Sequence, residues 1–73
     1  MTAMTSTRSE LLKVLSDLSD ACTEMRMGQL IANLATLARG AAVESIWDAE
    51  DDELLAAARR QAEAFRARRA GVA

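Results

Sequence analysis

Apolar residues recur every three or four positions along most of this chain, a spacing that predicts α-helices. The first apolar face consists of Leu11, Leu15, Leu18 and Cys22, widened by Leu12 and Val14. It predicts a helix over residues 8–22. Thr7 and Glu10 are spaced as in a capping box, in which a hydroxyl and a carboxylate bind free amides of the first turn. The small polar residues 1–6 before it are expected to be disordered.

A second apolar face predicts a helix over residues 26–39. Its members are Met27, Leu30, Ile31, Leu34, Leu37 and Ala38. Gly40, directly after Arg39, is typical of a helix C-terminus. Gly28 weakens the first turn relative to alanine, so its presence would be explained if another backbone or side chain packs closely against it.

A third helix is expected over residues 49–69, with Asp48 as its N-cap. Acidic residues fill its first turn and arginines its last turns, which matches the two ends of the helix dipole. Its apolar face consists of Leu54, Leu55, Ala58, Ala62 and Phe65. The apolar residues Val43, Ile46 and Trp47 predict that the linker over 40–48 is pinned onto the helices. Residues 70–73 are expected to be disordered.

These elements predict an all-α fold, because no segment alternates apolar and polar residues in the two-residue period of a strand. Three helices with short connections predict a small antiparallel three-helix bundle, or a helical hairpin with a third, alanine- and arginine-rich helical arm. Either arrangement forms a single domain over residues 7–69. A core of this size typically supplies only about 3–5 kcal/mol of net stability. Oligomerisation or docking onto a partner is the expected source of further stability.

The composition argues against catalysis. The chain has no histidine, which is the commonest general base near neutral pH. Cys22 is the only cysteine and lies on the apolar face of its helix, where thiols are usually inert. One cysteine without histidine cannot complete a tetrahedral zinc site. We therefore expect no catalytic residues, no metal and no cofactor.

The acidic run over residues 48–53 has two interpretations. Its oxygen atoms suit Mg²⁺ or Ca²⁺, but the run lacks the glycine and the spaced ligands of a calcium loop. An acidic helix start explains the same residues through the helix dipole. A solvated acidic ridge of this kind is also a candidate docking surface.

Targeting features are absent from the sequence. The N-terminal residues contain no apolar stretch of the signal-peptide type, and no apolar run approaches the roughly 20 residues needed to span a bilayer. A lone cysteine also argues against a disulfide-dense secreted domain. A cytoplasmic protein without membrane contact is expected.

A polar stripe interrupts the second helix. Arg26, Gln29, Asn33 and Thr36 follow at spacings of three, four and three. This stripe is either the solvent face of the helix or a hydrogen-bonding strip, which would be recognised by a partner or buried against the acidic start of the third helix.

Charge is divided unevenly along the chain. Residues 1–53 hold ten acidic against four basic residues, and residues 54–73 hold one against five, which gives the net charge of −2. The C-terminal arginines are candidate phosphate contacts, and they are Arg59, Arg60, Arg66, Arg68 and Arg69. A solvated face that also balances the helix dipole is one alternative interpretation. A third is intermolecular, since the acidic start and the basic end of the third helix would complement each other in an antiparallel pairing of two such helices.

The segment Arg26-Met27-Gly28-Gln29-Leu30, followed downstream by Trp47-Asp48 and an acidic helix start, resembles a diffuse group of short uncharacterised bacterial proteins. The resemblance covers residues 10–65, implies a helical fold and a bacterial origin, and implies no activity. It singles out Arg26, Gly28, Gln29, Asn33, Trp47, Asp51 and Asp52 as the positions of interest.

The sequence thus favours a small non-catalytic protein–protein interaction module, acting as a homo-oligomer or as a minor subunit of a larger bacterial assembly. Its expected contacts are the alanine-lined surface of the third helix and the strip at Arg26, Gln29 and Asn33, with Trp47, Asp51 and Asp52 as further partner-binding residues. The alternative is an antitoxin-like protein or transcription regulator that contacts DNA through its C-terminal arginines.

Overall fold

Helices form the whole regular structure of this protein, which confirms the predicted all-α fold class. The computed structural model describes the backbone of residues 3–72 and the side chains of residues 6–68. The helices are α1 (Ala3–Ala21), α2 (Met27–Arg39), α3 (Ser45–Asp48) and α4 (Asp51–Val72). The described backbone contains no strand.

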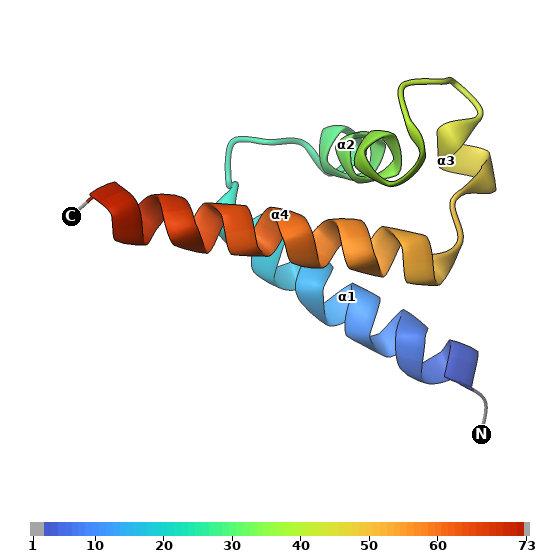
Figure 1. Ribbon diagram of the computed structural model, residues 1–73, viewed down its shortest axis with the longest axis horizontal. Coiled ribbons are helices and arrows are strands. Elements are labelled where there is room, and N and C mark those ends of the chain that lie inside the picture. Colours follow the sequence, from blue (N-terminus) through green and yellow to red (C-terminus); the bar gives the residue numbers. More distant parts are fainter. Residues whose placement is uncertain (1–2, 73) are drawn as a thin grey trace.

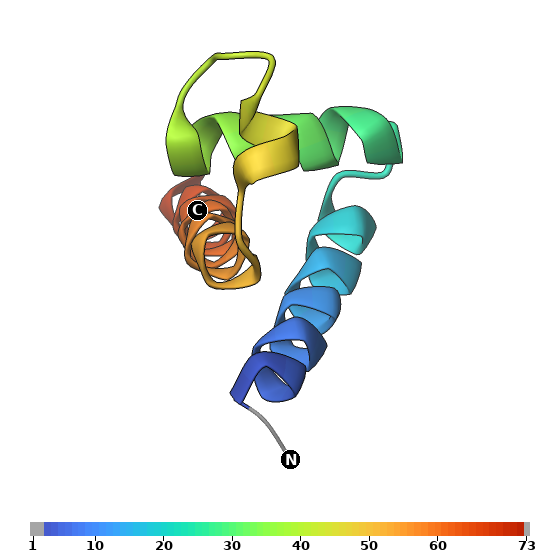
Figure 2. The same cartoon turned by 90° about the vertical axis from the view of Figure 1, so that its right-hand side faces the viewer.

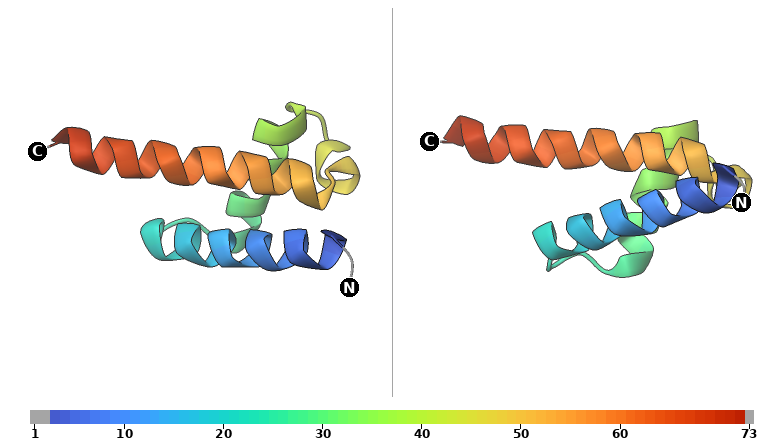
Figure 3. Two further views of the ribbon diagram at one scale, coloured as in Figure 1. Left: turned by 60° about the horizontal axis from the view of Figure 1, so that its bottom comes forward. Right: turned by 90° about the horizontal axis from the view of Figure 1, so that it is seen from below.

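The long helices α1 and α4 lie side by side and run in the same direction (Figure 1). Figure 2, which looks along α4, shows α2 lying across the pair. The small bundle therefore differs from the expected antiparallel one, because α2 crosses over α1 and α4 instead of aligning with them. The end of α4 extends beyond the end of α1 (Figure 3).

Helix α1 is longer than the predicted 8–22. Residues 3–6 are helical, so the expected disorder over 1–6 is wrong for them, and residues 1 and 2 lie outside the described part of the chain. Thr7 lies inside α1 and is not an N-cap. The Glu10 carboxylate instead accepts a hydrogen bond from Arg59 of α4 at 2.8 Å.

The bounds of α2 agree with the prediction to within one residue. The side chain of Gln29 accepts a hydrogen bond from the Arg26 amide at 3.1 Å, which satisfies one free donor of the first turn. Gly40 ends the helix with φ of 103°, and its amide donates to the Thr36 carbonyl at 2.7 Å. No atom lies within 4 Å of the position that a Cβ on Gly28 would take, so close packing does not explain this glycine.

The third predicted helix corresponds to α4, and the short α3 lies in the segment that was predicted as a linker. Asp48 belongs to the short α3 and is not the N-cap of α4. Glu50 directly precedes α4, and its amide donates to the Glu53 carboxylate at 2.8 Å. The predicted end at residue 69 and the expected disorder of 70–73 are also corrected, because α4 continues to Val72. Residue 73 lies outside the described residues.

The core is small and lies where the three long helices meet. Its buried residues are Leu11, Leu18, Leu30, Leu34, Leu55, Ala57 and Ala58. Leu54, Ala62 and Phe65 pack against it, which confirms the predicted apolar face of the last helix. Leu12 was expected on the apolar face of α1, but it is 58% exposed. Ala57 and Ala58, on the alanine-lined face of α4, are buried in the core of their own molecule. The expected role of this face as a partner contact is therefore corrected for these two residues.

Candidate functional site: an exposed tryptophan surface

The two most exposed large apolar side chains of the described residues, Trp47 and Val43, lie in the linker between α2 and α4. Trp47 is 87% exposed, Val43 84% and Ile46 53%. The expectation that these residues pin the linker is therefore wrong. We call these three residues, together with the acidic Glu44, Asp48, Glu50 and Asp52 around them, the Trp47 surface.

Polar contacts hold this linker in place. Ser45 is buried, and its hydroxyl donates to the Gly40 carbonyl oxygen at 2.6 Å. A guanidinium nitrogen of Arg39 donates to the Asp48 carbonyl at 2.9 Å and to the Glu53 carboxylate at 3.2 Å. Since both contacts close the linker from its inner side, the side chains of Trp47 and Val43 are left facing outward.

The start of α1 borders the Trp47 surface. A shallow depression of about 640 Å³ lies here, lined by Thr7, Arg8 and residues 47–52. Arg8 binds the Asp51 carboxylate at 2.7 Å. The hydrogen bond to Asp51 and the negative charge of that carboxylate raise the pKa of Arg8.

Only part of the negative charge at this end of the molecule is neutralised. Arg8 pairs with Asp51, and Arg39 pairs with Glu53. Among the described side chains no salt bridge reaches the four carboxylates of the Trp47 surface, although Asp52 accepts a hydrogen bond from the Glu53 amide at 2.8 Å. The Trp47 surface therefore combines exposed apolar area with four carboxylates that form no salt bridge within the described part of the chain.

The structure brings together three of the predicted partner-binding residues, namely Trp47, Asp51 and Asp52. The predicted partner contacts did not include Val43, Ile46 and Glu44, although the acidic run over residues 48–53 was a candidate docking surface. A local feature of the sequence could have identified them: Glu44, Asp48 and Glu50 flank the apolar residues of the linker, and such charges are rarely buried.

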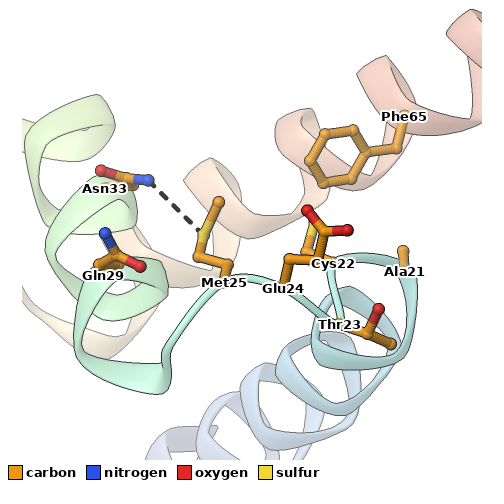
Figure 4. A pocket seen from close by; sticks show the side chains of 8 residues that line it. All are labelled: Ala21, Cys22, Thr23, Glu24, Met25, Gln29, Asn33 and Phe65. Atoms are coloured by element: carbon orange, nitrogen blue, oxygen red, sulfur yellow. Dashed lines mark hydrogen bonds between the residues drawn. The ribbon is translucent and has the colours of Figure 1, made fainter.

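The other three predicted residues lie elsewhere, at the turn between α1 and α2. Gln29 and Asn33 line an open hollow of about 600 Å³ together with Ala21, Cys22, Thr23, Glu24, Met25 and Phe65. Figure 4 shows Phe65 of α4 on one side of this hollow and the two amide side chains of α2 on the other. Arg26 directly precedes α2, and its backbone amide donates to the Gln29 side chain. The strip is exposed and is not buried against the acidic start of α4.

Within the hollow, polar side chains have local partners. The Asn33 amide nitrogen lies 3.7 Å from the Met25 sulfur, and the Gln29 oxygen accepts from the Arg26 amide. Cys22 follows the last residue of α1 and is half-buried rather than fully enclosed. The hollow is therefore explained by the way the α1–α2 turn packs against Phe65.

The candidate phosphate-binding arginines do not form one row. Arg59 binds Glu10 of α1 at 2.8 Å, whereas Arg60 donates to the Leu37 carbonyl of α2 at 3.2 Å. Arg66 pairs with Glu63 at 3.2 Å, and the Arg68 guanidinium lies 5.3 Å from the centre of the Phe65 ring. The side chain of Arg69 lies outside the described residues. Arg59 and Arg60 thus hold α4 against two different helices.

Neither a metal-binding cluster nor a membrane-spanning helix is found in the described part of the chain. There, no three side chains of histidine, cysteine, aspartate or glutamate gather closely enough to hold a metal ion. None of the helices between residues 3 and 72 combines the length and the apolar character needed to cross a bilayer.

No family model, curated protein sequence or solved structure matches this chain. The resemblance to short bacterial proteins consequently remains an expectation from sequence. Functional inference therefore depends on the side chains themselves.

Proposed function

We propose that this protein is a non-catalytic protein-interaction module that docks onto a partner through the Trp47 surface. The observation that carries the proposal is the 87% exposure of Trp47, the only tryptophan of the chain, beside the equally exposed Val43. The partner would be a second copy or another subunit of an assembly.

The energetics of tryptophan support this role. A buried tryptophan removes about 150–250 Å² from water, and tryptophans are enriched among the few interface residues that cost about 2 kcal/mol or more when truncated. In this fold Trp47 contributes almost none of that area, because it faces outward. A protein partner that covers Trp47, Val43 and Ile46 would recover it.

The charges of the Trp47 surface indicate the chemistry of the partner. Four carboxylates that form no salt bridge repel an acidic segment of a partner and attract a basic one. Arginine suits this surface best, because its planar guanidinium both stacks on a tryptophan ring and binds carboxylates. The expected partner segment therefore carries arginine.

A photoreactive residue placed at Val43 tests the proposal in the host cell. Val43 is exposed, and its replacement leaves Trp47 and the Ser45 contact in place. The matched control places the same residue at Ser16, which is exposed on α1. We expect one defined protein crosslinked from position 43 and not from position 16, and lost when Glu44→Arg and Asp48→Arg are added. Equal crosslinking from both positions, or none from position 43, would contradict the proposal.

A further inference from the structure

We propose that the occupant of the Trp47 surface is a second copy of this chain, which contributes the C-terminal arm of its α4, residues 66–72. This inference rests on the proposed function and names its partner. Two copies that exchange arms reciprocally would form a closed dimer.

The arm has the properties expected of a docking element. The end of α4 projects past α1 (Figure 3), and Phe65 is the last residue of the described side chains that packs against the core. Beyond it Arg66, Ala67 and Arg68 are all exposed, and the sequence adds Arg69. The arm is therefore a basic helical end.

An arm cannot reach the Trp47 surface of its own molecule. The surface lies at the start of α4 and the arm at its end, and a helix of 22 residues is about 33 Å long at about 1.5 Å per residue. Figure 1 shows the two ends on opposite sides of the molecule. The arm of one molecule can therefore reach the Trp47 surface only on another molecule.

The contacts that the arginines make within one molecule resemble those proposed between two. Arg68 already lies over an aromatic ring, that of Phe65, and Arg66 already binds a carboxylate, that of Glu63. Both members of the Arg66–Glu63 pair are largely exposed, so exchanging Glu63 for another carboxylate costs little. On the Trp47 surface the same side chains would find a larger ring and four carboxylates.

Reciprocal exchange also fits the thin core. Leu18 and Leu34 are the only large side chains of the described residues that are less than 2% exposed. A reciprocal contact uses the same two patches on both molecules and closes after two copies, whereas head-to-tail contacts leave unsatisfied ends. Closure therefore favours a dimer as the stable form.

Two charge-reversed variants test the contact. The surface variant carries Glu44→Arg and Asp48→Arg, and the arm variant carries Arg66→Glu and Arg68→Glu. Sedimentation velocity should show dimers for the natural chain and a roughly tenfold or greater loss of affinity for each variant alone, because like charges then face each other. An equimolar mixture should restore the dimer, since each surface then meets an arm of opposite charge.

Matched controls separate this contact from general effects of charge. Lys13→Glu with Arg26→Glu changes the charge as much as the arm variant does, but on exposed residues of α1 and the α1–α2 turn, so dimerisation should persist. Far-ultraviolet circular dichroism checks that every variant is helical. Trp47 fluorescence should shift to the blue with concentration in the natural chain and in this control, but not in the surface variant or the arm variant alone.

A natural chain that stays monomeric at high micromolar concentration, or a mixture without rescue, would overturn the dimer. The proposed function is tested separately, by the crosslinking experiment at position 43. If position 43 crosslinks a different protein, the Trp47 surface is a docking site and only the choice of a second copy is wrong.

Discussion

Ser45 and Trp47 lie two residues apart in α3, yet the serine is 5% exposed and the tryptophan is 87% exposed. This inverts the usual preference, in which aromatic side chains are buried and hydroxyls face water. The serine is buried because its hydroxyl has a partner inside, the Gly40 carbonyl oxygen. The tryptophan is then directed outward.

Replacing Trp47 by alanine should leave the free energy of unfolding of the monomer within about 0.5 kcal/mol of the natural value, because an exposed side chain loses few contacts. The control is Phe65→Ala, which removes a half-buried ring that packs on the core and should cost about 2 kcal/mol, less than the about 3–5 kcal/mol of a fully buried one. Urea unfolding at low protein concentration measures both. A large loss for Trp47→Ala would mean that the ring is packed.

Ser45→Ala should destabilise the protein by about 1 kcal/mol, because the buried Gly40–Ser45 hydrogen bond is lost. For a domain of this size that corresponds to a fall of about 4–8 °C in Tm. Thermal unfolding measures the change. Ser16→Ala, on an exposed face of α1, should not lower Tm, since alanine is the better helix former.

Two leucines of α1 should respond very differently to the same substitution. Leu18→Ala empties a site that is 1% exposed and should cost about 2–5 kcal/mol, enough to unfold much of a protein with so small a core. Leu12→Ala, at a site that is 58% exposed, should change the free energy of unfolding by less than about 0.5 kcal/mol. Similar losses in urea titrations of both variants would place Leu12 in the core.

The two described glycines predict opposite effects of alanine. Gly28→Ala should stabilise by up to about 0.5–1 kcal/mol, since nothing occupies the space for a Cβ and alanine favours the helix. Gly40→Ala should cost about 1–3 kcal/mol, because φ of 103° with ψ of 174° is a region almost confined to glycine. Urea midpoints of the two variants give the signs directly.

Arg59→Ala and Arg60→Ala should each lower the free energy of unfolding by less than about 1 kcal/mol, because the contacts to Glu10 and to the Leu37 carbonyl are exposed. Neither substitution should change retention on DNA at about 50 mM salt, where phosphate contacts are strongest. A retention by the natural chain that disappears in the double variant would favour the DNA-binding alternative.

Local sequence was sufficient for the parts of the fold that depend on local interactions. The bounds of α2 followed from one apolar face and from Gly40, because glycine readily adopts the positive φ that ends this helix. The interpretation of Thr7 as a cap was wrong, because α1 begins at Ala3 and the Glu10 carboxylate pairs with Arg59 of α4.

By itself, the sequence determined the helical class, the second helix and the uneven charge, since periodicity, caps and composition are properties of neighbouring residues. Only the tertiary structure decided the rest: α2 crosses α1 and α4, Arg8 meets Asp51, and Trp47 faces outward. A helix of four residues such as α3 is too short for a periodic pattern to show its inner face. Its orientation comes from Arg39 and Gly40, outside the segment, and such contacts exist only once the helices have packed.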